Sequence, residues 1–160
     1  MRKFEKISYE QFKKDIKDDK ELYNSIELPR RSTKHSAGYD IKSIESGIIK
    51  PKESKSFKTG LKVSMNEDEV LYIYSRSSLG YKYNVCLVNS VGVIDSDYYN
   101  NKVNEGHFQV KLINLGDKDF EVNTGDRIAQ GVFMKYLTVD NEEEIMNERK
   151  GGIGSTDKEE

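Results

Sequence analysis

Short polar blocks that lie far apart in this chain carry the residue types that a nucleotide site requires. They are residues 37–40 (Ala-Gly-Tyr-Asp), 75–78 (Ser-Arg-Ser-Ser), 92–98 (Gly-Val-Ile-Asp-Ser-Asp-Tyr) and 151–156 (Gly-Gly-Ile-Gly-Ser-Thr). Glycines let the backbone approach phosphate, hydroxyl and guanidinium groups donate hydrogen bonds to its oxygens, and a carboxylate can orient a water molecule. One such block would carry little information, but four blocks in 160 residues predict one composite site for a nucleoside polyphosphate.

The block at residues 92–98 offers a candidate general base. Val93 and Ile94 have the side chains of a strand, so Asp95 is expected at the end of that strand, just before a turn. A carboxylate that backbone donors hold at such a turn can stay ionised and orient a water molecule. Aspartate also caps hairpin turns, and from this block alone that structural role is the more frequent one.

The block at residues 75–78 offers donors to phosphate. It follows an apolar strand that ends at Tyr74. Arg76 presents planar, paired N–H groups, and the hydroxyls of Ser77 and Ser78 can close around the same oxygens. An ordinary polar turn is the alternative, but a turn placed directly after a buried strand is well suited to hold a ligand.

The block near the C-terminus is rich in glycine. Three glycines within residues 151–154 let successive N–H groups point at an anion. The block lacks the spacing and the lysine of a P-loop. A flexible terminus is the alternative, but a basic, glycine-rich patch that begins at Arg149, inside an otherwise acidic tail, favours a role in binding phosphate.

The elements that must position these blocks are mostly strands. From residue 40 to 139 apolar and polar side chains alternate, as in residues 57–63 and 108–112, and glycines recur at intervals typical of turns. Many short strands without intervening helices predict an all-β sandwich or barrel. Residues 140–160 carry many acidic and few apolar side chains, which predicts a mobile arm unless a ligand or another subunit holds it.

Residues 8–24 are predicted to form one amphipathic helix. Ser8 followed by Gln11 fits a capping box, and Phe12 and Ile16 lie on a narrow apolar stripe. Such a helix is expected to pack on the domain. The chain is therefore divided into an N-terminal helical extension (1–30), a β-domain (31–139) and a C-terminal arm (140–160).

Composition excludes several classes of protein. Only 35% of residues are hydrophobic and 34% are charged, so the core is lean and self-association is expected. A net charge of −2 argues against binding to nucleic acid, which favours a basic surface. No stretch is apolar enough for a membrane span or a signal peptide, so a soluble, cytoplasmic protein is expected. Cys86 is expected to be a packed core thiol, and His35 and His107 to be surface or turn residues.

Taken in order, the blocks resemble the five motifs of the homotrimeric dUTPases. The motifs are residues 37–40, 75–78, 89–98, 125–130 and 149–156, and together they span about three quarters of the chain. The adjacent Tyr98 and Tyr99 and the segment 104–107 are most similar to the Gram-positive bacterial and phage branch. The resemblance implies a jelly-roll-like, distorted β-barrel and a homotrimer with its sites at subunit interfaces. The implied reaction is hydrolysis of dUTP to dUMP and pyrophosphate with Mg²⁺, which limits uracil in DNA and supplies dUMP for thymidylate synthesis.

The resemblance also implies roles around the base and the sugar. Asp95 would orient and deprotonate the attacking water. Tyr98 would stack under the deoxyribose and leave no room for a 2′-hydroxyl. Asn89 would pair with the uracil edge, together with the backbone of a hairpin that includes Val93 and Ile94 and has no space for a thymine methyl group.

Around the phosphates, the resemblance implies that Arg76, Ser77, Ser78 and Gln130 bind phosphate oxygens. Asp40 would support the magnesium ion indirectly, through its shell of water. Metal binding would otherwise come mainly from the phosphates themselves, as fits a hard cation that dehydrates reluctantly.

The arm would fold over the triphosphate of a neighbouring subunit. Arg149, Ser155 and Thr156 would meet the terminal phosphate, and Gly154 belongs to the same loop. The family usually has an aromatic residue at the position of Ile153, stacked on uracil. Isoleucine covers a ring by dispersion only, so we expect stacking to weaken by about 1 kcal/mol.

Two rival functions remain open at this point. The first is a dCTP deaminase on the same fold, although nothing around Asn89 suggests activation of a cytosine amino group. The second is a nucleotide-gated interaction protein whose partner recognises the ordered arm. The product formed from dCTP or dUTP, ammonia or pyrophosphate, separates the first rival from a dUTPase.

Overall fold

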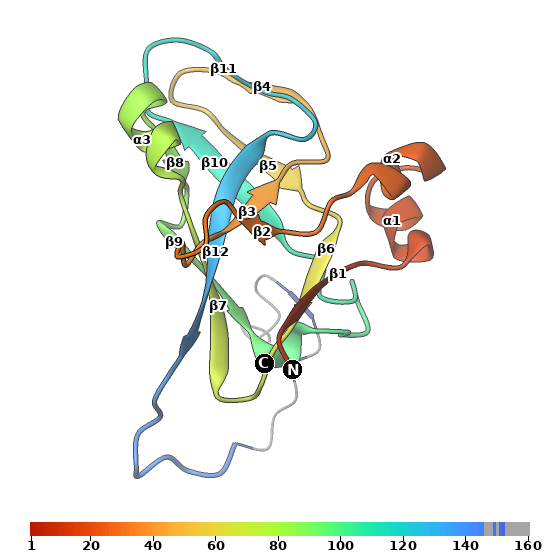
Figure 1. The fold of residues 1–160 in the computed structure, drawn as a ribbon, viewed down its shortest axis with the longest axis vertical. Helices are drawn as coiled ribbons and strands as arrows, with labels where there is room; N and C mark the ends of the chain where they lie inside the picture. The colour runs from red at the N-terminus through yellow and green to blue at the C-terminus, as the bar shows by residue number, and fades with distance from the viewer. Residues whose placement is uncertain (146–148, 150, 153–160) are drawn as a thin grey trace, which may run out of the picture.

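The computed structural model describes residues 1–145, 149, 151 and 152, and β-strands are its main regular secondary structure (Figure 1). The strands of these residues are β1 (Lys3–Lys6), β2 (Arg30–Arg31), β3 (Tyr39–Lys42), β4 (Gly47–Ile49), β5 (Ser54–Lys58), β6 (Leu61–Ser64), β7 (Glu69–Tyr74), β8 (Val85–Leu87), β9 (Val91–Asp95), β10 (Gln109–Asn114), β11 (Phe120–Val122) and β12 (Arg127–Lys135). Three short helices accompany them in this part of the chain, namely α1 (Tyr9–Asp15), α2 (Lys20–Ser25) and α3 (Ser77–Tyr83).

The strands pair in an antiparallel manner and form several small sheets rather than one. The largest has the order β2-β3-β12-β7-β9, with the long strand β12 between β3 and β7. A three-stranded sheet has the order β5-β10-β8, and β1-β6 and β11-β4 form pairs. This arrangement confirms the predicted all-β fold of the jelly-roll-like, distorted barrel type. Strand β12 brings β3 and β7, which are distant in sequence, to one place.

The core follows the two-residue alternation of the sequence. In β6, Leu61 and Val63 are buried while Lys62 lies on the other face, and in β10 Val110 and Leu112 are buried in the same way. These side chains belong to one continuous apolar cluster that also takes in residues of β1 and α1. A single core therefore connects the N-terminal extension with the barrel.

The predicted single helix over residues 8–24 is wrong, because two helices occupy this stretch. Ser8 caps α1 by accepting a hydrogen bond from the Gln11 amide at 3.1 Å, as predicted. The helix ends at Asp15, and Asp19 then caps α2 through the Leu22 amide at 2.8 Å. Aspartate competes with the helix by bonding nearby backbone groups, so it favours a new start over continuation. Strand β1, which pairs with β6, was not predicted.

Helix α3 was also missed, since residues 75–78 were expected to form a turn after β7. Arg76 has extended backbone angles and begins the helix, and Asn84 ends it in the left-handed conformation at φ 54°. Only Leu79 in this helix is buried, so the sequence shows no helical period there.

Cys86, on β8, is half-buried rather than packed in the core, because it faces away from its buried neighbours Val85 and Leu87.

His107 is buried, contrary to the expected surface position. Its side chain lies between the end of α1 and the turn at Gly60, with Nδ1 2.7 Å from Asp15 Oδ2 and Nε2 accepting from the Gly60 amide at 3.0 Å. Among the described residues no helix is long and apolar enough to cross a bilayer.

The free energy of unfolding should fall as the pH drops below about 6.5. Burial lowers the pKa of His107, against the opposite effect of Asp15, so the unfolded chain binds a proton that the folded chain resists. One such group changes stability by at most about 1.4 kcal/mol per pH unit. Urea unfolding at a fixed protein concentration, between pH 7.5 and 5.5, measures this slope. Carboxylates of lowered pKa lose their contribution to stability only at lower pH. A free energy of unfolding that does not change between pH 7.5 and 5.5 would therefore contradict the lowered pKa of His107.

Candidate functional site

Asp40 lies at the centre of a charged group that we call the Asp40 cluster, which comprises Ser32, Asp40, Arg76 and Arg127. Arg76 Nε donates to Asp40 Oδ1 at 3.0 Å, while Arg127 Nη1 and the Ser32 hydroxyl donate to Oδ2 at 3.2 and 2.5 Å. Burial opposes ionisation of Asp40, but the Ser32 hydroxyl and the two guanidinium groups outweigh it and lower the pKa of the carboxyl. Asp40 therefore fixes two cationic side chains at one end of the main sheet.

Pairing along β12 explains how this cluster assembles. Gln130 of β12 lies opposite Asp40 of β3 and opposite Tyr74 of β7. Its side-chain amide donates to the Ser75 carbonyl at 3.2 Å. A side chain at Gly38 would place its Cβ 2.4 Å from Gln130 Oε1, so a larger residue there would displace the side-chain amide of Gln130. The structure thus brings three of the predicted motifs together within one chain.

Ser77 and Ser78 begin helix α3, directly after Arg76. The first N–H groups of a helix have no partner within it and carry partial positive charge. Ser77 is exposed and Ser78 half-buried. Two hydroxyls, the first amides of α3 and the neighbouring guanidinium of Arg76 together form a donor-rich surface that suits phosphate.

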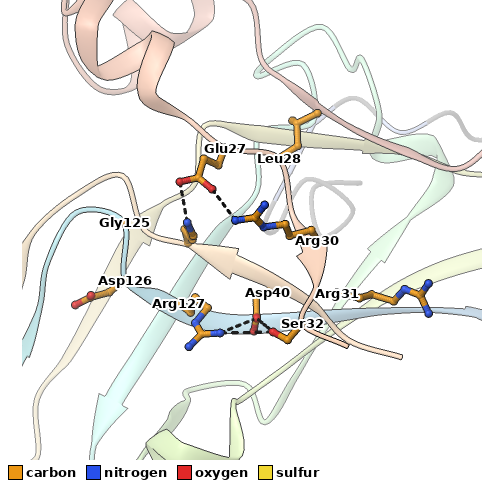
Figure 2. Close-up of a pocket in the computed structure, with 10 residues that line it drawn as sticks. Glu27, Leu28, Arg30, Arg31, Ser32, Asp40, Gly125, Asp126 and Arg127 are labelled. Carbon is orange, nitrogen blue, oxygen red and sulfur yellow. Dashed lines mark hydrogen bonds and ion pairs between the residues drawn. The ribbon is translucent and has the colours of Figure 1, made fainter. Parts of the chain in front are cut away.

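A pocket of about 700 Å³ opens beside the Asp40 cluster (Figure 2). Asp40, Ser32 and Arg127 form one wall, and Glu27, with its ion pairs, lies across from them. The lining includes Asp40 but not Asp95. No role was predicted for Ser32 or Arg127, although Arg127 lies within the predicted motif at 125–130 and could have been identified from its charge.

Asp95 belongs to a second group, the Asp95 cluster, which comprises Asp95, Asp97, Tyr98 and Arg149. Asp95 is the last residue of β9, as predicted, and a short 3₁₀ turn (Ser96–Tyr98) follows. Arg149 Nη2 donates to Asp95 Oδ2 at 2.5 Å, and its Nε donates to Asp97 Oδ1 at 2.7 Å. The arm therefore places a guanidinium group directly on the candidate base.

The hydroxyl of Tyr98 is held by two hydrogen bonds to residues outside this cluster. It donates to the His107 carbonyl at 3.0 Å and accepts from Asn104 Nδ2 at 2.7 Å. A side chain at Gly152 would bring its Cβ 2.9 Å from the Tyr98 hydroxyl, so the arm also passes close to this ring. His107 and Asn104 were not predicted to support the site, and only their position in the segment that resembles the Gram-positive branch hinted at it.

The turn that carries Asn89 connects β8 and β9, which belong to different sheets, so the predicted hairpin is not formed by these two strands. Asn89 is exposed, and Ser90 turns the chain with φ 61°. The Leu87 amide donates to the Ser75 side chain at 2.9 Å, which ties the end of β8 to the motif at residues 75–78. Further along β9, Val93 is exposed and Ile94 is buried. Strand β9 is also the last strand of its sheet, so among the described residues one edge of its backbone has no neighbouring strand.

The two clusters lie at opposite ends of strand β7. Asp95 pairs with Val70, whereas Tyr74, four residues on, pairs with Gln130 of the Asp40 end. At about 3.3 Å per residue this step covers roughly 13 Å, and Arg76 lies two residues further along the chain. The Arg76 side chain bonds Asp40. Within one chain, therefore, the candidate base does not face the candidate phosphate donors.

The remaining predicted site residues, Ile153, Gly154, Ser155 and Thr156, lie outside the described residues. In the part of the chain that the structure describes, no three histidine, cysteine, aspartate or glutamate side chains group as metal ligands. The Asp40 carboxylate has about four acceptor positions, of which Ser32, Arg76 and Arg127 take three. One position is left for the water of a hydrated cation, so Asp40 fits indirect support of a metal rather than direct ligation.

Comparison with known proteins gives a consistent result. The dUTPase family model matches residues 24–157. Deoxyuridine 5′-triphosphate nucleotidohydrolase of Lactococcus lactis is 50% identical over 132 residues, which cover 82% of this chain and 88% of that protein. The crystal structure of a dUTPase from Streptococcus mutans is similar with a TM-score of 0.72 and 42% identity, covering 87% of this chain and 99% of that one. A dUTPase of Staphylococcus bacteriophage 80alpha shares the fold, with a TM-score of 0.68, 23% identity and 97% coverage of each chain.

Proposed function

Because this chain belongs to the dUTPase family and is a dUTP diphosphatase, we propose that Asp95 is its general base. The carboxylate is half-buried at the end of β9, where the backbone fixes its direction. From there it would orient a water molecule for in-line attack on the α-phosphorus of dUTP and accept its proton. Pyrophosphate then leaves, and dUMP remains.

Phosphate binding is assigned to the donors at the Asp40 end. Arg76 supplies charge, Ser77 and Ser78 supply hydroxyls, and Gln130 supplies an amide. These groups are preorganised where negative charge develops in the transition state, and such donors contribute most in a site that excludes water. Asp40 holds Arg76 at 3.0 Å and so keeps one of these donors in place.

Recognition of the nucleoside is assigned to the turn between β8 and β9, to β9 itself and to Tyr98. Asn89 and the backbone beside the exposed Val93 would bond the uracil edge, and Ile94 anchors this strand in the core. The ring of Tyr98 would pack against the deoxyribose. Selection against ribose would follow from the absence of space for one more hydroxyl.

Mg²⁺ is the metal we propose, bound to the triphosphate and its waters, where it would neutralise phosphate charge. Asp40 would accept one hydrogen bond from such a water. The arm residues Ile153, Gly154, Ser155 and Thr156 are proposed to cover the nucleotide, with Arg149 at the terminal phosphate. A cytoplasmic location, where dUTP arises and is consumed, completes the proposal.

The active unit is proposed to be a homotrimer in which different copies contribute to each site. The observation that supports this is the separation of Asp95 from Arg76 along β7. A base that must lie beside the α-phosphorus cannot act from the far end of the strand. A second copy that brings its own Asp95 to the Asp40 cluster resolves the difficulty.

Two inactive variants should therefore restore activity when they are mixed. Arg76→Ala and Asp95→Asn each spoil a different half of the site, so a mixed assembly regains sites in which both halves are intact. Random assembly of equal amounts predicts about a quarter of the wild-type activity, because each half is intact in half of the chains. Pyrophosphate release from co-expressed chains measures it. A mixture as inactive as its components would show that each chain builds its own site.

A further inference from the structure

The N-terminal segment contacts the loop that follows Tyr98 at several points. We call residues 99–107 the 99–107 loop. Tyr99 donates its hydroxyl hydrogen to Glu5, and the Ser8 amide and hydroxyl donate to the two carboxylate oxygens of Glu105 at 2.9 and 2.5 Å. Asp15, at the end of α1, bonds His107 at 2.7 Å. The family-model match begins at residue 24, so all three contacts come from a segment outside it.

The contact between Asp15 and His107 is the most enclosed of the three. The Gly60 amide can only donate, so His107 Nε2 must accept from it and the ring proton must be on Nδ1, which donates to Asp15. The His107 residue is only 7% exposed. A hydrogen bond to a carboxylate is stronger than one between neutral groups, so this pair fixes the ring and the backbone to which it is attached.

That backbone in turn holds Tyr98. The His107 carbonyl accepts from the Tyr98 hydroxyl at 3.0 Å, and Asn104 Nδ2 donates to the same hydroxyl at 2.7 Å and to the carbonyl at 3.2 Å. Gly106, at φ 84°, approaches so closely that a Cβ there would lie 2.6 Å from the Tyr98 carbonyl. The 99–107 loop thus contacts Tyr98 at its hydroxyl and at its backbone carbonyl. Helix α1 contacts the same loop through the bond of Asp15 to His107.

We propose that the N-terminal segment positions Tyr98 for the selection of deoxyribose over ribose. Asp15 and His107 are the positioning residues, and the contact of Ser8 with Glu105 supports the same loop. None of them is among the residues proposed to contact the nucleotide. The proposal rests on the sugar-binding role proposed for Tyr98. It gives the N-terminal extension a purpose in the reaction, because a ring that tilts away from the sugar leaves space for a 2′-hydroxyl.

The test compares kcat and KM for dUTP and for UTP in Asp15→Ala and a matched control. Asp18→Ala is the control, because Asp18 is exposed on the same segment, bonds Tyr9 and has no contact with the 99–107 loop. Loss of the bond to His107 should lower the ratio of kcat/KM for dUTP over UTP by roughly tenfold, mostly through KM. Asp15→Asn keeps an acceptor oxygen and should stay near the wild-type ratio.

Two further measurements keep the result decisive. Hydrogen exchange of the 99–107 loop should be faster in Asp15→Ala than in Asp18→Ala. If Asp15→Ala fails to fold, Ser8→Gly serves instead. Glycine caps a helix almost as well as serine but has no side chain to bond Glu105. Ser8→Gly should therefore also lower the ratio of kcat/KM for dUTP over UTP.

Tyr98→Ala, measured beside them, separates the possible failures. If Tyr98→Ala lowers the ratio and the loosened variants do not, the N-terminal segment has no part in selection and the inference is wrong. If Tyr98→Ala itself leaves the ratio unchanged, the proposed role of Tyr98 fails, and the inference fails with it.

Discussion

Asp95→Asn lowers kcat for dUTP by about 10³-fold, which is the contribution expected of a general base. The amide has the shape of the carboxylate but cannot accept a proton from water. Binding of dUTP should persist, because the groups that hold phosphate and uracil are unchanged. Pyrophosphate release measures the loss of turnover, and equilibrium binding of dUTP to the variant measures what remains.

Asp97→Asn is the matched control for this experiment. Asp97 lies two residues further on, is exposed, and bonds the same arginine as Asp95 does. If Asp95 acts only as a partner of Arg149, the two variants should lose similar activity. If Asp95 is the base, Asp97→Asn should keep kcat within a few-fold of wild type. Equal losses would contradict the proposed role of Asp95.

Arg149→Ala should lower kcat/KM by about 10²-fold, since one charged donor to the transition state is removed. The arm brings this guanidinium to Asp95 and Asp97 at 2.5 and 2.7 Å. The proposed contact with the terminal phosphate therefore requires Arg149 to exchange one anionic partner for another. Steady-state kinetics with dUTP measure the change.

Two companion variants define what Arg149 contributes. Arg149→Lys keeps the charge but loses the planar, paired donors, so it should recover only part of the activity. Truncation after Glu148 should abolish hydrolysis and leave the proposed trimer intact, as judged by its mass in solution. Full activity of the truncated chain would remove the arm from the mechanism.

Much of the site could be predicted because its candidate residues occur in short, contiguous sequence motifs. Asp95 ends β9 as predicted, because the β-branched Val93 and Ile94 favour a strand and the following serine and aspartate favour a turn. The family and the Gram-positive branch are confirmed by the relatives in Lactococcus and Streptococcus. The roles assigned to single side chains remain predictions.

The sequence could not reveal features that depend on distant partners. The contact of Asp15 with His107 joins residues 92 positions apart, and no local pattern marks either as buried. Ser32 and Arg127 join the Asp40 cluster through strand pairing, which the sequence does not specify. The division of the first helix into two depended on Asp19, whose capping side chain outweighed a continuous helical pattern.

The separation of Arg76 from Asp95 along β7 also determines how defective copies of this protein affect the activity of intact copies in the same cell. A copy that has lost both Arg76 and Asp95 inactivates two sites. One is the site to which it would contribute Arg76, and the other is the site to which it would contribute Asp95. Such a copy would be dominant negative, because it would reduce the activity of co-expressed intact copies by more than simple dilution.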